Sequence, residues 1–226
     1  RQREQRKVPM TPAASTTDRQ SQILQAAMKV FEQNGYTSTT MDAVAAEAGV
    51  SKGSIYNYFK SKQTLFAAVV NHVIEQEEAK TLPVIEADMP AAEKFGKLLD
   101  SWAEAIQHLK GLGKVILESW AVGSREDPEG EILSQFRQAY ARWQGWLADV
   151  VGQGIEEGDF APDLNPALGA AIYQAVLDGL MVQHIYDVGV RITPELMAGW
   201  RNGFLAALRD RSPRPLPPAG GQAEES

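Results

Sequence analysis

The chain has 226 residues, of which 44% are hydrophobic and 23% charged, with no cysteine and a formal net charge of −7. This length and composition suit one large globular domain or two smaller ones, and the lack of cysteine excludes disulfides and thiolate metal sites. No apolar run approaches the roughly 20 residues that span a bilayer, and no apolar core follows the basic N-terminal residues. We therefore expect a cytoplasmic protein without a secretory signal or a membrane segment.

Charge is distributed unevenly along the chain. Residues 1–62 carry nine Lys or Arg and five Asp or Glu, a net charge of +4, whereas the remaining residues carry a net charge of −11. This asymmetry indicates that the first part contacts a polyanion and that the second part does not.

Apolar residues recur at helical spacing throughout the chain, and the alternation typical of strands is missing. The fold class is therefore predicted to be all-α. Both ends, residues 1–16 and 212–226, are polar or rich in proline and glycine, which predicts disordered tails. The first helix is expected to begin at Thr17 or Asp18 and to stop at Gly35.

Two short helices joined by a glycine turn follow. Thr39 or Thr40 is expected to cap the first of them, Gly49 to adopt a positive φ in the turn, and Ser51 to cap a helix of residues 52–59. This is the plan of a helix-turn-helix. A longer helix begins at residue 61 or 62.

The helix of residues 52–59 is predicted to have two faces. Ile55 and Phe59 are four residues apart and face the core, which leaves Lys52 and Tyr56 on the other side with Ser54 beside them. A helix in the major groove reads bases with its N-terminal residues, and small or flexible side chains suit that position.

A series of short elements occurs in a fixed order over about fifty residues. In order, they are Ile23-Leu24-x-Ala26-Ala27, Phe31, Gly35-Tyr36, Thr39-Thr40, Ala45, Ala48-Gly49-Val50-Ser51, Gly53, Tyr56-x-Tyr58-Phe59 and Lys62. Together they resemble the DNA-binding domain of the TetR family of transcriptional regulators. The resemblance implies base-edge contacts from Lys52, Gly53, Ser54 and Tyr56, and phosphate contacts from Thr40, Asn57, Tyr58 and Lys62. From the residues alone, Tyr36 and Tyr58 are also explained as packing residues, Thr40 as a helix cap and Lys60 as a solvated charge.

Residues 17–62 are thus predicted to form the DNA-binding domain, and residues 63–211 a helical ligand-binding and dimerisation domain. In the second domain, helices are expected from Pro90 through 106, around 115–120, over 132–151, and over about 166–187 and 194–210. Gly111 and Gly113, residues 123–130 and residues 158–166 are expected to separate the first four of these.

The last two helices are predicted to pair two copies of the chain. One side of the first carries Leu168, Ile172, Ala175, Val176, Gly179, Leu180 and Gln183, and the second carries a stripe of Met197, Trp200, Phe204 and Leu208. Two such helices per chain can form a four-helix bundle in a homodimer, which the resemblance also implies. The alternative is that both stripes pack within one chain. A dimer places two reading helices roughly 34–36 Å apart.

Aromatic residues gather in the middle helices, where they can line an apolar pocket or form an ordinary core. The resemblance places a small-molecule effector there, and the predicted effector residues are Trp102, Ile106, Trp120, Phe136, Tyr140, Trp143, Gln174, Leu177, Asp178 and Met181. Glu118 and His184 are further polar candidates. Lipophilic cations and neutral hydrophobic ligands both fit this composition.

The predicted function is a ligand-responsive DNA-binding regulator, a repressor that a small hydrophobic or aromatic effector releases from a palindromic operator. A helical scaffold without operator binding is the alternative. Catalysis is not expected, because the three histidines are widely spaced and no phosphate-binding loop, dinucleotide motif or nucleophile elbow occurs. No cofactor or metal is expected.

Overall fold

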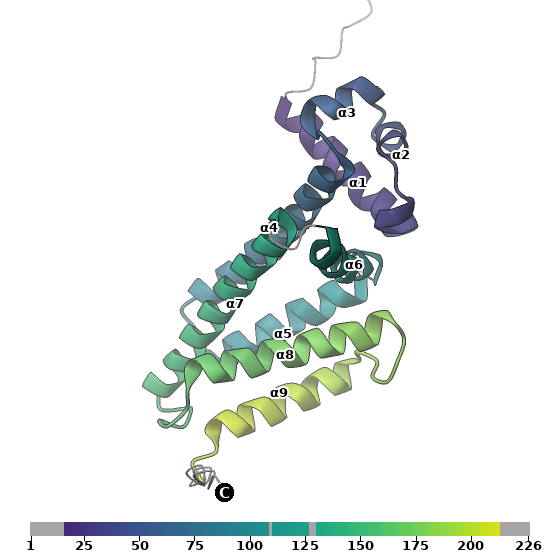
Figure 1. The fold of residues 1–226 in the computed structure, drawn as a ribbon. Helices are drawn as coiled ribbons and strands as arrows, with labels where there is room; N and C mark the ends of the chain where they lie inside the picture. Colours follow the sequence, from purple (N-terminus) through teal and green to yellow (C-terminus); the bar gives the residue numbers. More distant parts are fainter. Residues whose placement is uncertain (1–15, 109, 127–129, 213–226) are drawn as a thin grey trace, which may run out of the picture. The chain divides into compact units, whose positions relative to one another are not determined.

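The computed structural model describes residues 16–108, 110–126 and 130–212, and these residues form nine α-helices and no strand (Figure 1). The predicted all-α class is confirmed. Apart from residues 16 and 212, the two predicted tails lie outside the described residues. Within the described ranges, no helix combines the length and the apolar character that crossing a bilayer requires.

The helices follow one another with short connections. Their bounds are α1 (Thr16–Ser38), α2 (Met41–Glu47), α3 (Lys52–Tyr58), α4 (Lys62–Glu86), α5 (Ala91–His108), α6 (Lys110–Glu126), α7 (Glu131–Glu156), α8 (Pro166–Ile185) and α9 (Pro194–Arg209).

The chain divides into two compact units. The first unit holds α1, α2, α3, α4 up to Glu77, α6, and α7 up to Arg137; the second holds the rest of α4 and α7 together with α5, α8 and α9. α6 belongs to the first unit because it packs against α1. The compact units therefore do not coincide with residues 17–62 and 63–211, which were assigned as domains by their expected functions.

Helix starts follow local chemistry. The hydroxyl oxygens of Thr40 and Ser51 accept hydrogen bonds from the amides of Ala43 and Ser54, both at 3.1 Å, and so cap α2 and α3. Thr193 and Asn165 cap α9 and α8 in the same way. Gly49 has φ +62° in the turn between α2 and α3, as predicted.

The glycines of α6 are helical and do not form the predicted break. α6 begins at Lys110, so that Gly111 and Gly113 lie inside it, and it continues to Glu126, through residues that were expected to form a loop. The reason is close packing. A Cβ at Gly111 would collide with the side chain of Glu32 on α1, and one at Gly123 would lie 2.9 Å from Cγ of Leu133 on α7.

An aromatic trio forms the centre of the first unit. The rings of Phe31, Tyr36 and Phe66 are buried; the Phe66 centroid lies 4.8 Å from that of Phe31 and 4.8 Å from that of Tyr36. Phe31 and Phe66 come from α1 and α4, so the trio joins these helices just before the chain enters α2.

A second aromatic cluster joins α5, α8 and α9 in the second unit. Trp200 and Phe204 of α9 pack against Tyr173 of α8 with ring centroids 5.2 Å away, and Phe95 of α5 lies 5.3 Å from Phe204. Met197 and Leu208 are buried, whereas Trp200 and Phe204 are half-buried. The α9 stripe thus packs in part within the chain, where contacts with α5 and α8 remove some of the surface of its aromatic rings from water.

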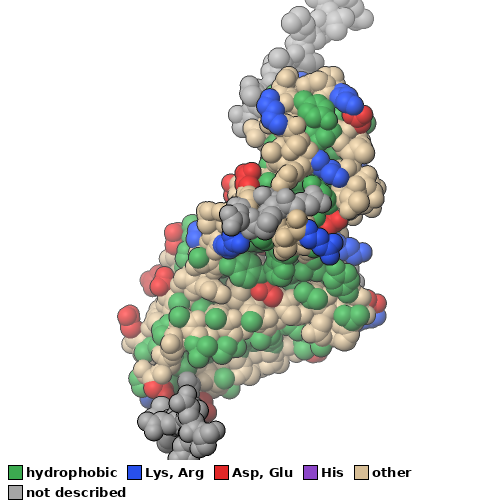
Figure 2. All heavy atoms as spheres, in the orientation of Figure 1, with side chains coloured by type: hydrophobic (Ala, Val, Ile, Leu, Met, Phe, Trp, Pro, Cys, Tyr) green, Lys and Arg blue, Asp and Glu red, His purple; other side chains and the backbone are tan. Residues whose placement is uncertain are grey.

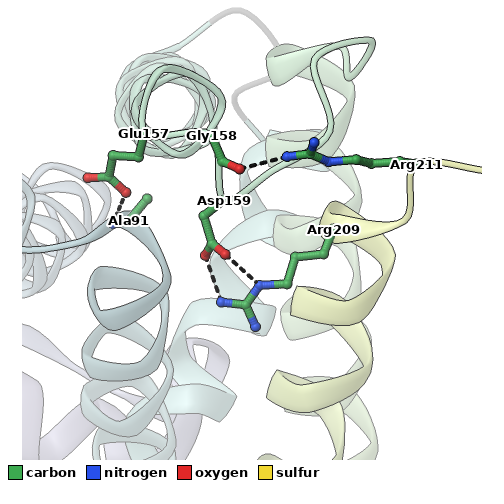
Figure 3. A network of polar contacts seen from close by, with 6 residues as sticks. All are labelled: Ala91, Glu157, Gly158, Asp159, Arg209 and Arg211. Atoms are coloured by element: carbon green, nitrogen blue, oxygen red, sulfur yellow. Dashed lines mark hydrogen bonds and ion pairs between the residues drawn. The ribbon is translucent and has the colours of Figure 1, made fainter.

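Polar contacts fix the end of α9 to the loop that precedes α8 (Figure 3). Two nitrogens of Arg209 donate to the two carboxylate oxygens of Asp159, at 2.9 and 2.6 Å, and Arg211 donates to the carbonyl of Gly158 at 2.7 Å. The hydrogen bonds from Arg209 lower the pKa of Asp159 below its usual value.

Candidate DNA interface and effector region

α3 has the two faces that its sequence predicts. Ile55 is fully buried and Phe59 nearly so, which fixes the helix to its unit. On the opposite side, Lys52, Gly53, Tyr56 and Asn57 are exposed, and Ser54 and Tyr58 are half-buried. Lys and Arg side chains are scattered over the surface formed by α1 to α3, with uncharged and acidic side chains between them (Figure 2). This face carries donors and small side chains rather than a hydrophobic patch.

Gly53 lies at an open position in the first turn of α3. A Cβ built there would meet nothing within 4 Å. The backbone is not strained at this residue, so no contact within the described part of the chain requires glycine. The missing side chain does let an outside surface approach the helix backbone closely.

Lys52 has a partner that sequence reasoning missed. Its Nζ lies 2.8 Å from Oδ2 of Asp42 on α2, and the hydrogen bond to Asp42 raises the pKa of Lys52. Both side chains are exposed, so the pair contributes little to stability. It does aim the ammonium group of Lys52 along the outer surface of α2 and α3. Nothing in the local pattern of the sequence signals this contact across the turn.

Lys62 bonds to the backbone within its own unit. Its Nζ donates to the carbonyls of Tyr36 at 2.8 Å and Thr37 at 3.2 Å, and it lies 4.3 Å from the centroid of the Tyr36 ring. Tyr36 is a buried packing residue. Thr40 is the cap of α2, and it is exposed beside this contact.

The predicted effector residues are divided between the two units. Trp120 and Phe136 lie in the first, where their rings meet edge to face at 6.0 Å. The other predicted residues lie in the second: Ile106, Leu177 and Met181 are buried, and Trp102, Tyr140, Trp143, Gln174 and Asp178 are half-buried.

Within the second unit, four of these residues come together from α7 and α8. The rings of Tyr140 and Trp143 lie 5.5 Å apart. Asp178 makes side-chain hydrogen bonds with Tyr140 and Gln174. Burial raises the pKa of Asp178, and these two hydrogen bonds offset part of the rise. Burial and the nearby Asp178 charge also raise the pKa of Tyr140. We call Tyr140, Trp143, Gln174 and Asp178 the α7–α8 cluster.

The two additional polar candidates have structural partners. The carboxylate of Glu118 accepts a hydrogen bond from the amide of Tyr36 at 2.8 Å, within the first unit. His184 is buried, and its Nδ1 accepts from the amide of Ile192 at 3.4 Å. The part of the chain that the structure describes contains no group of three or more His, Asp or Glu side chains that could hold a metal ion.

Two protein families match the chain. The family described as "Bacterial regulatory proteins, tetR family" matches residues 23–69, and the "BetI-type transcriptional repressor, C-terminal" family matches residues 91–210. The first match contains the helix-turn-helix, and the second extends from α5 through α9.

Similar proteins include two curated bacterial regulators. The uncharacterised HTH-type transcriptional regulator YhgD of Bacillus subtilis is 29% identical over 155 residues, which cover 69% of this chain and 78% of that protein. The HTH-type transcriptional repressor KstR2 of Mycobacterium tuberculosis is 28% identical over 172 residues, which cover 74% of this chain and 80% of that protein.

Solved structures share the fold. A TetR transcription regulator from Haloarcula marismortui superimposes with a TM-score of 0.74 at 24% identity, covering 85% of this chain and 98% of that one. A transcriptional regulator from Saccharomonospora viridis, solved in complex with choline, gives a TM-score of 0.71 at 21% identity, with coverage of 84% and 97%.

Proposed function

Because the chain belongs to the TetR family and is a DNA-binding transcriptional regulator, we propose that it is a homodimeric repressor that a small apolar effector releases from a palindromic operator. The observation that carries the proposal is the outer face of α3. Lys52, Gly53, Ser54 and Tyr56 lie together there on a helix that the buried side chain of Ile55 fixes in place. A helix built this way can enter the major groove by its N-terminal end.

We propose that one set of residues contacts base edges and that another contacts phosphates. We assign base edges to Lys52, Gly53, Ser54 and Tyr56, since an ammonium or hydroxyl group can reach groove atoms from the first turns of α3. Thr40, Asn57, Tyr58 and Lys62 flank this face and are assigned to phosphates. Lys62 would exchange one of its carbonyl partners for a phosphate oxygen, or share its three donors between them.

Ser54→Ala is expected to change the preference at one base pair, because it removes a hydroxyl group from the reading face. The expected loss is about 0.5–1.5 kcal/mol on the preferred duplex and close to none on duplexes altered at that pair. Competition binding on a set of single-base variants measures this. Ser124→Ala, which removes an exposed hydroxyl from α6, is the matched control. An equal loss on every duplex would argue against base contact by Ser54.

The proposed dimer face lies on the outward sides of α8 and α9. Leu168, Ile172 and Val176 of α8 are 58%, 50% and 37% exposed, and apolar side chains gather over this region in Figure 2. Gly199 and Gly203 lie on α9, where an added Cβ would meet nothing within 4 Å. Glycine weakens a helix, so we take these two glycines, which have no close neighbour among the described residues, as positions that allow a partner helix to approach closely.

The proposed effector site includes the α7–α8 cluster. Its aromatic rings supply apolar contact area, and Asp178 supplies a carboxylate whose hydrogen-bond partners among the described residues, Tyr140 and Gln174, are neutral. A half-buried carboxylate paired only with neutral groups is better stabilised by a cation, and aromatic faces also attract cations. We therefore propose that the effector is a lipophilic cation, which presents apolar groups to the aromatic rings and its charge to Asp178.

Asp178→Asn is expected to abolish stabilisation by such a cation without lowering the stability of the free protein at pH 7.5. The fold raises the pKa of Asp178, so ionisation destabilises the folded wild type as pH rises through this pKa, and asparagine removes that penalty. Thermal unfolding with choline, and with its neutral analogue 3,3-dimethylbutanol, measures both effects. An equal choline shift in wild type and variant would exclude Asp178 from the site.

The proposed function is tested by selecting duplexes from a random library with the full chain. The expected product is an inverted repeat whose half-sites are about one helical turn apart, bound with an affinity that falls steeply as salt rises. Failure to enrich any sequence at low ionic strength would favour the helical scaffold instead. Acting on chromosomal DNA, the protein would work in the cytoplasm and by binding rather than by catalysis.

A further inference from the structure

The backbone of Tyr36 is held at both ends by charged side chains from two other helices. Its amide donates to Oε2 of Glu118 on α6 at 2.8 Å, and its carbonyl accepts from Nζ of Lys62 on α4 at 2.8 Å. Hydrogen bonds to ionised partners are stronger than those between neutral groups. One residue of the connection between α1 and α2 is therefore fixed between an anion and a cation.

The backbone at this point is shaped to receive Glu118. Gly35 has φ +72°, which breaks the helical path of α1, and a Cβ added there would lie 3.4 Å from both carboxylate oxygens of Glu118. The carbonyl of Gly35 accepts from the hydroxyl of the buried Thr39 at 2.7 Å. Residues 35–39, which we call the α1–α2 hinge, are thus held by contacts from α1, α4 and α6.

The hinge leads directly into α2 and α3, which together we call the reading head. Thr40, the cap of α2, is the next residue, and the amide of Val50 bonds to the carbonyl of Ala45 at 3.0 Å where the chain turns from α2 into α3. A shift of the hinge therefore moves α2 and α3 together. It also moves the carbonyls of Tyr36 and Thr37, to which Lys62 is bonded.

We propose that Glu118 is a positioning residue for DNA binding: through its hydrogen bond to the Tyr36 amide, it fixes the α1–α2 hinge and with it the reading head and Lys62. This inference rests on the proposed function, because it requires an operator that α3 reads. It goes further by naming the contact through which α6 sets operator affinity.

α6 is suited to this role by its other contacts. Trp120 lies two residues after Glu118, so the two side chains leave α6 on opposite sides, and the Trp120 ring packs edge-on against Phe136 of α7 at 6.0 Å. Because α6 is a continuous helix, a movement of its Trp120 side also moves Glu118. Tyr36 is 6% exposed, so loss of Glu118 leaves its amide poorly placed to find water instead.

The test uses the full chain and compares Glu118→Ala with Glu118→Gln and with Glu156→Ala. Glutamine keeps an oxygen that can accept the Tyr36 hydrogen bond. Glu156 is an exposed glutamate near the end of α7, and its replacement makes the same change in net charge. Each variant is measured for affinity to the selected duplex, affinity to a scrambled duplex, and hydrogen exchange at the Tyr36 amide.

Glu118→Ala is expected to weaken binding to the selected duplex about three- to tenfold. It should weaken scrambled-duplex binding by a clearly smaller factor, because only the phosphate contact of Lys62 is shared by both duplexes, and it should speed exchange at the Tyr36 amide. Glu118→Gln is expected to stay within about twofold of wild type for all three measurements. A merely structural role would lower both affinities together and would not affect the Tyr36 amide selectively.

Two results would overturn the inference while leaving the proposed function intact. In one, Glu118→Ala binds the selected duplex as tightly as Glu156→Ala does. In the other, Glu118→Ala and Glu118→Gln weaken binding equally, which would mean that the charge of Glu118, and not its hydrogen bond to Tyr36, determines the affinity for the selected duplex. If wild type itself selects no duplex, the proposed function fails first.

Discussion

Ile172→Asp is expected to convert the protein into monomers of about 24.7 kDa and to lower operator affinity by more than about 100-fold. Ile172 is 50% exposed on α8, between Leu168 and Val176 on the proposed dimer face. In a symmetric dimer the substitution occurs twice, and each new carboxylate would have to lose its water at the interface without a partner. A monomer engages one half-site and loses the high effective concentration of the second reading head.

Light scattering coupled to size exclusion gives the mass, and anisotropy titration gives the affinity. Leu82→Asp is the matched control, since Leu82 is an exposed leucine on α4 and is not part of the proposed dimer face. The control is expected to stay dimeric and to bind DNA like wild type. A dimeric Ile172→Asp variant would show that the pairing surface lies elsewhere.

Phe66→Ala is expected to lower the free energy of unfolding by about 3–5 kcal/mol. Phe66 has no exposed surface, and its ring contacts those of Phe31 and Tyr36 at 4.8 Å. Removing it empties the centre of the aromatic trio under the reading head and next to the α1–α2 hinge. Because the trio joins α1 to α4, operator binding is expected to be lost with the fold of the head.

Chemical denaturation followed by far-UV circular dichroism measures the change in stability, and the mass of the variant reports whether α8 and α9 still pair. Phe66→Leu is the control because it keeps most of the buried volume, and a much smaller loss is expected. If Phe66→Ala proves as stable as Phe66→Leu, the trio contributes little to the head.

Features fixed by neighbouring residues could be predicted from the sequence. The positive φ of Gly49 and the caps at Ser51 and Thr193 each depend on a few consecutive residues. The buried face of α3 follows from the four-residue spacing of Ile55 and Phe59. These features carry both the helix-turn-helix and its outward face.

Contacts between distant residues could not be predicted. Glu118 and Tyr36 are 82 positions apart, and nothing in either local pattern indicates that a carboxylate will meet that amide. Asp42 was missed as the partner of Lys52 for the same reason.

Periodicity also leaves open which face of a helix meets which neighbour. The α9 stripe of Trp200 and Phe204 was identified correctly as an apolar face, but its spacing did not indicate that these rings contact α5 and α8 of the same chain. Gly111 was interpreted as a helix break, whereas its role depends on the side chain of Glu32 on another helix. Both outcomes are set by packing, which a single helical pattern does not contain.

The central claim, that a dimer of this chain reads two operator half-sites with α3, is tested most directly by changing the spacing between them. Full-length protein is titrated against the selected inverted repeat and against the same duplex with five base pairs inserted between its halves. The insertion turns one half-site to the opposite side of the DNA, and the predicted result is an affinity loss of about 100-fold or more. Equal affinity for the two duplexes would contradict the account.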